Sequence, residues 1–398
     1  MVPAMTVRLG PTPESVTLPD GFAAAGIHCG LKRDGQLDLG LLLAERPVAI
    51  AALFTTNQLT GAHITVCRER LATSGGMARA ILVNARNANC ATGARGVDAG
   101  HRCCRELARR LDCADEHVLM ASTGPIGAHL PADRIIDHLD ALLAKTRPGG
   151  GMDFARAIMT TDSYPKAVCT DQHGACTTGF AKGSGMIHPD MATMLGFILT
   201  DARPPAPADG LLRAVADRSF HRVTVDGDTS PNDSLFAWFG GTADCSADQL
   251  ESSMTTTAVG LARLLAADGE GASRLITVEV RGARNEREAT VVGRTIATSP
   301  LVKTAVAGRD PNWGRILSAA GRAGVTFATA SARVWVGGVD VFADGRPLVE
   351  NEPAARRHLL DDERIVLGVD LAIGTAAADV WTCDLTADYV RINADYRT

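Results

Sequence analysis

At the centre of the chain stands Ala181-Lys-Gly-Ser-Gly-Met-Ile-His-Pro-Asp-Met-Ala-Thr-Met-Leu-Gly-Phe-Ile-Leu-Thr-Asp201, a glycine-rich loop followed by an apolar run. The apolar part, residues 194–199, has the length and bounds of a buried strand or of the start of a helix. Its backbone is therefore expected to be rigid. Gly183, Gly185 and Pro189 ahead of it allow a tight, strained loop.

Thr193 stands where the loop meets the apolar run, directly after the small residue Ala192. In a strained loop, a neighbouring oxygen can attack the carbonyl of the bond between them. Cleavage there exposes an α-amine on Thr193 with a reference pKa of roughly 7.7–8, so one residue becomes both nucleophile and base. Glycine-rich loops before apolar segments are common, and an uncleaved loop is the alternative.

Composition, charge and cysteine spacing exclude several classes of protein. The 398 residues are 46% hydrophobic and 21% charged, with a net charge of −5 and dispersed basic residues. This charge pattern offers no footprint for nucleic acid or for an anionic membrane. No apolar stretch is long enough to span a bilayer, and residues 1–8 lack the apolar region that a signal peptide needs. The ten cysteines lack zinc-ligand spacing. We therefore expect a soluble cytoplasmic protein without a metal, a cofactor or disulfides.

The hydrophobic pattern predicts an α+β fold in which helices cover sheets. Strand-like runs occupy residues 47–54, 63–67, 80–83, 118–122, 276–280, 365–367, 369–371 and 379–382. Helical spacing is found at residues 99–111, 135–143 and 252–267. From Leu275 onward strands are expected to dominate, with a hairpin that runs from Arg333 through Asp344-Gly345 to Leu348.

Two further segments could contribute to a reaction centre. Ser122-Thr-Gly-Pro-Ile-Gly127 follows a predicted strand, so the backbone amides of Thr123 and Gly124 either bind an oxyanion or belong to a plain turn. Ser184 is the rival nucleophile, but Lys182 takes the place of the first glycine of a nucleophile elbow.

Three charged segments have simpler interpretations. Residues 226–233 are rich in turn formers and carboxylates but lack the spacing of a calcium loop, which favours a structural loop. Glu270 lies on a predicted exposed turn, where it can pair with the amine of a ligand. Arg309 and Arg315 either bind an anion or mark a loop-to-helix junction.

Taken together, the motifs resemble the ornithine acetyltransferase family, also called the glutamate N-acetyltransferases of arginine biosynthesis. The matching landmarks span nearly the whole chain: residues 122–127, 157–162, 182–186, 191–194, 226–230, 232–233, 268–272, 299–305, 308–315, 384–386, 389–393 and 396–398. Such an ordered set is highly specific.

The resemblance implies residue roles. Thr193 is the nucleophile, freed by cleavage after Ala192, and Thr123 and Gly124 form the oxyanion hole. Substrate contacts fall on Lys182, Glu270, Asn393, Thr398 and one of Thr160 and Thr161, and Thr193 belongs to the same set.

The resemblance also implies a fold and an assembly. The expected fold is a layered sandwich of β-sheets flanked by helices, similar to the N-terminal-nucleophile hydrolases but distinct in topology, with a smaller C-terminal α/β part. Residues 1–192 form an α chain and residues 193–398 a β chain. The two chains together build the catalytic unit and assemble as a heterotetramer (α2β2) or larger.

The implied activity is a ping-pong acetyl transfer from N-acetylornithine to glutamate, which yields ornithine and N-acetylglutamate without a cofactor. The alternatives are a related amidase or aminopeptidase that hydrolyses the acyl-enzyme, and an uncleaved binding protein. Three positions depart from the usual pattern, at Arg86, at His188 and Asp190 around Pro189, and at Pro231. The segment around Arg86 also resembles paralogues of antibiotic biosynthesis, so the pathway is left open.

Overall fold

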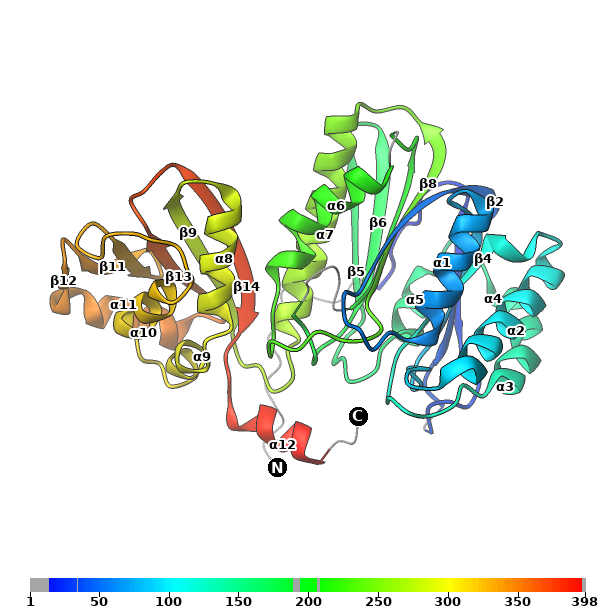
Figure 1. Ribbon diagram of the computed structural model, residues 1–398, viewed down its shortest axis with the longest axis horizontal. Helices are drawn as coiled ribbons and strands as arrows, with labels where there is room; N and C mark the ends of the chain where they lie inside the picture. The colour runs from blue at the N-terminus through cyan, green and yellow to red at the C-terminus, as the bar shows by residue number, and fades with distance from the viewer. Residues whose placement is uncertain (1–13, 34, 189–193, 206–207, 396–398) are drawn as a thin grey trace.

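The chain folds into two lobes (Figure 1). The computed structural model describes residues 14–33, 35–188, 194–205 and 208–395. Within these residues, β1 to β8 form an eight-stranded sheet in the larger lobe, and β9 to β14 form a six-stranded sheet in the smaller one. Helix α12 (Ala387–Asp395) lies below the junction of the two lobes in Figure 1.

The larger sheet has the strand order β4-β3-β2-β8-β7-β6-β5, with β1 paired to β2. Its strands are β1 (Phe22–Ile27), β2 (Leu39–Phe54), β3 (Met77–Asn84), β4 (Val118–Ser122), β5 (Lys166–Gln172), β6 (Ala175–Lys182), β7 (Leu195–Ala202) and β8 (Ser234–Ala243).

Strand β2 is 16 residues long and divides this sheet into two halves. Its register with β3 shifts between Leu43 and Val48, and its second half pairs with β8. Such an irregularity bends a strand. The inner faces of the two halves then share one core, in which Leu42 and Ile81 belong to the same cluster as Phe197. The larger lobe is therefore a sandwich built from one bent sheet.

Helices cover both outer faces of the sandwich. Since side chains alternate along a strand, Leu41 and Leu82 face outward and pack with α2, whereas Ile198 faces outward beside α7. The helices of this lobe are α1 (Ala62–Ser74), α2 (Gly93–Leu111), α3 (Ala132–Asp137), α4 (Leu139–Lys145), α5 (Gly151–Ala157), α6 (Ala208–Arg218) and α7 (Ala247–Ala267). This arrangement confirms the predicted α+β sandwich flanked by helices.

The smaller lobe has a core of its own. Its sheet has the order β12-β11-β10-β13-β9-β14. The strands are β9 (Leu275–Ala283), β10 (Arg333–Val336), β11 (Val339–Ala343), β12 (Arg346–Pro347), β13 (Arg364–Asp370) and β14 (Ala376–Cys383). The helices are α8 (Glu286–Ala297), α9 (Pro300–Ala307), α10 (Trp313–Gly321) and α11 (Glu352–Asp361).

Two predictions for this lobe were wrong in detail. Strands do not dominate after Leu275, because α8, α9 and α10 follow β9 in succession and α11 lies between β12 and β13. The single predicted hairpin is a three-stranded meander. Gly337 and Gly338, with φ of 62° and 77°, form the tight turn between β10 and β11, and the Asp344-Gly345 turn joins β11 to β12.

The predicted strand at residues 63–67 is also wrong, since this run lies inside helix α1. Five apolar and β-branched residues are too few for their pattern to distinguish a strand from a buried helix. The signal that identifies this run as helical lies at the end of the helix. Gly75 takes the left-handed conformation with φ of 64° and donates its N–H to the Leu71 carbonyl, which ends the helix.

The glycine-rich loop of the central segment connects two hydrogen-bonded neighbours. Strands β6 and β7 are antiparallel, and Lys182 pairs with Leu195 at the base of the loop. The predicted cleavage residues Ala192 and Thr193 lie outside the described residues, as does Thr398. Within the part of the chain that the structure describes, no helix is long and apolar enough to cross a membrane.

Candidate active site

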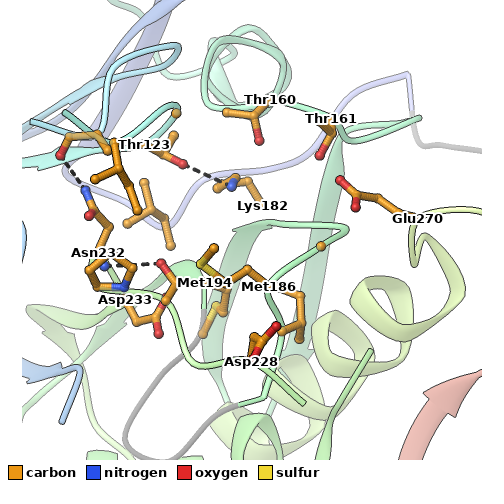
Figure 2. Close-up of a pocket in the computed structure, with 18 of the residues that line it drawn as sticks. Thr123, Thr160, Thr161, Lys182, Met186, Met194, Asp228, Asn232, Asp233 and Glu270 are labelled. Carbon is orange, nitrogen blue, oxygen red and sulfur yellow. Dashed lines mark hydrogen bonds between the residues drawn. The ribbon is translucent and has the colours of Figure 1, made fainter. Parts of the chain in front are cut away.

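A cavity of about 300 Å³ lies where β4 and β6 end and where β7 and β8 begin (Figure 2). Met194, the first described residue after the predicted cleavage bond, lines it. The residues predicted from sequence that also line it are Thr123, Gly124, Thr160, Thr161, Lys182, Glu270 and Asn393. These side chains come from five separate segments of the chain, so the fold brings together what the sequence only suggested.

The backbone around Thr123 and Gly124 is fixed by the loop after β3. The Thr123 N–H donates to the Asn84 carbonyl at 3.0 Å, and the Thr123 carbonyl accepts from the Asn87 N–H at 2.9 Å. Gly124 has φ of +139°, and a Cβ there would lie 2.4 Å from the carbonyl carbon of Arg86. Only glycine fits this approach. The Thr123 amide is thus already engaged, contrary to the expectation that both amides face the cleft.

What Thr123 offers the cavity is its hydroxyl group. Lys182 Nζ donates to Thr123 Oγ1 at 3.0 Å, as the dashed line in Figure 2 shows. An ammonium group can only donate, so the hydroxyl proton of Thr123 is available to another acceptor. The Gly124 N–H donates to no backbone carbonyl among the described residues. The hydroxyl and this amide together form a pair of donors suited to an oxyanion.

Burial lowers the pKa of Lys182, although the nearby Asp162, Asp233 and Glu270 favour its charged form and Lys166 opposes it. The amine is therefore more easily neutralised than that of an exposed lysine.

A buried triad of charges supports one wall of the cavity. Lys166 Nζ contacts Asp162 Oδ1 at 2.7 Å and Asp268 Oδ2 at 2.5 Å, and all three side chains are fully buried. Asp162 also accepts from the Thr160 N–H at 2.9 Å and from the Gly183 N–H at 2.6 Å. The triad thereby fixes both a predicted substrate contact and the first glycine of the loop.

The electrostatics of the triad follow from burial and pairing. Burial opposes ionisation of Asp162, but Lys166 and Lys182 outweigh it and hold the pKa of that carboxyl below its usual range. Burial likewise opposes the charge of Lys166, and its two carboxylate partners raise its pKa. Burial raises the pKa of Asp268 despite its contact with Lys166. The ionised form is therefore favoured more strongly at Asp162 than at Asp268.

Ser184, the rival nucleophile, joins two walls of the cavity instead. Its hydroxyl lies 2.7 Å from Thr161 Oγ1, and its carbonyl accepts from the Glu270 N–H at 2.8 Å. Asn393 on α12 donates to Glu270 Oε2 at 2.9 Å. A Cβ at Gly185 would lie 2.4 Å from the same oxygen. Ser184 and Gly185 therefore set the position of Glu270, and the partner of the Ser184 hydroxyl is another hydroxyl rather than a base.

The acidic loop at residues 226–233 holds the segment ahead of the predicted cleavage bond. Asp226 accepts from the N–H groups of Met186 at 2.6 Å and Ile187 at 2.9 Å, and Thr229 Oγ1 donates to the His188 carbonyl at 2.9 Å. These contacts confirm the structural loop that its turn-rich sequence predicted. Groups of three or more potential metal ligands do not occur among the residues described.

Other predicted residues lie elsewhere. Arg309 donates to the Val306 carbonyl at 2.9 Å, and Arg315 donates to the Leu301 carbonyl at 2.8 Å. Both therefore support the loop-to-helix junction between α9 and α10.

Several lining residues were missed as site residues. They are Met186, Asp228, Asn232, Asp233 and Tyr389. Asn232 and Asp233 had a usable signal, because they directly precede a long apolar strand in the sequence. No comparable signal marks Tyr389.

Comparison with known proteins shows the family of this chain. A model of the ArgJ family matches residues 23–398. The chain belongs to the ArgJ family. An arginine biosynthesis bifunctional protein ArgJ from Parasynechococcus marenigrum (strain WH8102) is 44% identical over 96% of this chain and 95% of the relative. The protein of the same description from Synechocystis sp. (strain ATCC 27184 / PCC 6803 / Kazusa) is 42% identical over 96% of this chain and 98% of its own length.

Among solved structures, the arginine biosynthesis bifunctional protein argJ from Bacillus halodurans is 37% identical, with a TM-score of 0.49. The match covers 50% of this chain and 98% of that one. Membership of the ArgJ family confirms the resemblance identified from the landmark motifs, and with it the prediction of a glutamate N-acetyltransferase enzyme.

Proposed function

We propose that this protein transfers an acetyl group from N2-acetyl-L-ornithine to L-glutamate, after cleaving itself between Ala192 and Thr193. The observation that carries the proposal is that one cavity joins Thr123 and Lys182 from before this bond to Met194 and Glu270 from after it. The relatives' description as arginine biosynthesis proteins supports the pathway.

In the first half-reaction, the Thr193 hydroxyl attacks the acetyl carbonyl of N-acetylornithine, and the α-amine of the same residue takes the hydroxyl proton. The tetrahedral oxyanion is stabilised by the Thr123 hydroxyl and the Gly124 N–H, both from residues that line the cavity. Ornithine leaves, and the acetyl group stays on Thr193 as an ester.

In the second half-reaction, the amine of glutamate attacks this ester through the same oxyanion, and N-acetylglutamate leaves. Lys182, already bonded to Thr123, adds positive charge beside the donors. An ammonium group near the α-amine of Thr193 also disfavours protonation of that amine, which keeps it basic.

The remaining predicted residues recognise the substrates. Glu270 pairs with an amine of the substrate. Asn393 donates to the carboxylate of Glu270 at 2.9 Å and so holds it in place. Thr160 or Thr161 and the terminal Thr398 complete the set. The backbone of Thr160 is fixed by Asp162, and the hydroxyl of Thr161 is bonded to Ser184.

The sheet supports the proposal that an α chain (1–192) and a β chain (193–398) stay together after the cut. Strand β6 belongs to the first chain and β7 to the second, and they pair from Thr177 with Thr200 to Lys182 with Leu195. Strands β2 and β8 also pair across the two chains. The chains therefore share one core and build one catalytic unit, which we propose assembles as α2β2 or larger.

Two measurements test the proposal. Intact-mass analysis should give two fragments for the wild type, with masses that match a cut after Ala192, and one full-length chain for Thr193→Ala. Release of ornithine from N-acetylornithine should then depend on added glutamate. Release at the same rate without glutamate would instead indicate a hydrolase, and a single wild-type chain would refute self-cleavage.

A further inference from the structure

The proposed transfer leaves one buried amide of the cavity without a role. Asn232 lies two residues before β8, lines the cavity and is only 5% exposed. Its Nδ2 donates to the Ala88 carbonyl at 2.5 Å and to the Ser122 carbonyl at 2.8 Å. An amide nitrogen carries two hydrogens. Both therefore have an acceptor, and the two carbonyls fix the orientation of the amide.

These two carbonyls belong to the segments that support the proposed oxyanion donors. Ser122 ends β4 and directly precedes Thr123. Ala88 lies in the loop after β3 and follows Asn87, whose N–H donates to the Thr123 carbonyl at 2.9 Å. Figure 2 shows Asn232 and Thr123 on the same side of the cavity. The amide of Asn232 thus joins the segment that carries Thr123 to the loop against which that segment rests.

The rest of the Asn232 side chain is placed unfavourably. Its Oδ1 is buried and has no hydrogen-bond partner among the described residues, which costs free energy. The amide also packs closely on Gly61, where an added Cβ would lie 2.9 Å from Cγ, Nδ2 and Oδ1 of Asn232. An apolar side chain would avoid the unpartnered oxygen. The amide is therefore best explained by what its nitrogen holds.

We propose that Asn232 is a positioning residue for acetyl transfer, which holds Ser122 and Ala88 so that the Thr123 hydroxyl and the Gly124 N–H meet the oxyanion. This inference rests on the proposed function, because it assumes that these two donors stabilise the oxyanion. Displacing a positioned group by about 1 Å can cost on the order of 10²-fold in rate. Asn232 itself does not touch the substrate in this role.

The first test is Asn232→Ala in the glutamate-dependent assay, with kcat expressed per cut chain as counted by intact mass. The variant should lower kcat roughly 30- to 100-fold. The KM for N-acetylornithine should stay within about threefold, because an interaction made only in the transition state does not contribute to substrate binding. Asn351→Ala is the matched control. Asn351 Nδ2 donates to the Asp340 carbonyl at 2.8 Å in the smaller lobe, and this variant should keep the wild-type kcat.

A double-mutant cycle separates positioning from a merely structural role. Residues that act as a unit give non-additive losses. Asn232→Ala should therefore lower kcat at least threefold less in a Thr123→Val background, where one of the donors that it positions is already gone. A fall in the folded fraction would instead multiply kcat by the same factor in both backgrounds.

A second variant disturbs the amide without removing it. Gly61 has φ of −62° and ψ of 143°, an extended conformation that alanine also adopts. In Gly61→Ala, the new Cβ would push the Asn232 amide away from its two carbonyls, and kcat should fall roughly tenfold. With Asn232→Ala present, Gly61→Ala should cause no further loss, because the amide is absent. Gly61→Ala alone also keeps the measurement possible if Asn232→Ala does not fold or is not cut.

The outcomes distinguish this inference from the function on which it rests. A wild type that releases ornithine without needing glutamate would overturn the proposed transfer itself. A glutamate-dependent wild type overturns only the role of Asn232 if Asn232→Ala keeps the wild-type kcat, or if its loss is the same in the Thr123→Val background. A loss in Gly61→Ala that persists in full without the Asn232 amide would overturn that role too.

Discussion

Removing Lys166 should damage the fold and the active site together. We consider Lys166→Met, which keeps the length of the side chain and removes its charge. Lys166 is fully buried between Asp162 and Asp268, at 2.7 and 2.5 Å. The variant leaves two carboxylates without the cation between them. Asp162 keeps two N–H donors, and Asp268 keeps one, the Ser163 N–H at 3.0 Å.

The size of the effect follows from these contacts. Breaking a buried ion pair by removing one partner typically costs about 3–5 kcal/mol. Asp162 keeps its bonds from the Thr160 and Gly183 N–H groups. Asp268, whose pKa is already raised, can take up a proton. We therefore expect a loss near the lower end, about 3 kcal/mol, which lowers the Tm of a domain of this size by roughly 6–12 °C.

The measurement is urea unfolding at pH 7.5 in the Thr193→Ala background, where the chain is expected to remain uncut. Lys145→Met is the matched control, because it makes the same chemical change at an exposed lysine on α4. The free energy of unfolding should change there by no more than about 0.5 kcal/mol. In otherwise wild-type protein, Lys166→Met should also reduce turnover, since Asp162 positions Thr160. A loss of stability below about 1 kcal/mol would refute the assignment of Lys166 as the charge that holds this wall.

Three further changes test other parts of the molecule. Thr123→Val removes the hydroxyl that faces the cavity and should reduce kcat about 10²–10³-fold in the glutamate-dependent assay; a loss below about fivefold contradicts the oxyanion role. Gly185→Ala places a Cβ 2.4 Å from Glu270 Oε2, and displacing that charged partner should raise the KM for N-acetylornithine roughly tenfold to a hundredfold, whereas an unchanged KM would exclude Glu270 as a contact. Burial lowers the pKa of His63 to about 3, against about 6.5 when unfolded. The unfolded chain then binds the extra proton first, so stability is full above pH 6.5, falls toward pH 3, and has lost roughly 2 kcal/mol at pH 5. Urea unfolding of His63→Gln at pH 7.5 and 5 should show this part of the loss abolished, and an identical loss in both proteins would contradict it.

Prediction from the sequence was most reliable where the hydrophobic pattern and the length of the run indicated the same element. The runs at residues 80–83 and 118–122 became β3 and β4, and the spacing at residues 99–111 lies within α2. Prediction failed at residues 63–67, where the turn at Gly75 decides the element rather than the local pattern. It also could not reveal that β2 bends and lets one sheet form both layers, because the register shift depends on which strand lies beside each half.

Many residues of the candidate site could be predicted from the sequence, but the hydrogen bonds and ion pairs between them could not. Thr123 was identified, but its amide was expected to face the cleft, and only the pairing with Asn84 shows that it does not. Lys166 and Asp268 were not predicted to meet, since they are 102 positions apart. Buried charge pairs leave no periodic trace in a sequence, so their partners emerge only from the fold.

These contacts suggest why one loop can serve both the cut and the transfer. The segment before the predicted cut is held by Asp226 and Thr229, and the segment after it is held by the pairing of β7 with β8. Both anchors lie outside the bond itself, so the proposed cut leaves them intact. Because β6 and β7 pair on either side of the proposed break, the two chains would stay joined at the cavity. The cavity lined by Thr123 and Lys182 would therefore keep its walls after the proposed cut.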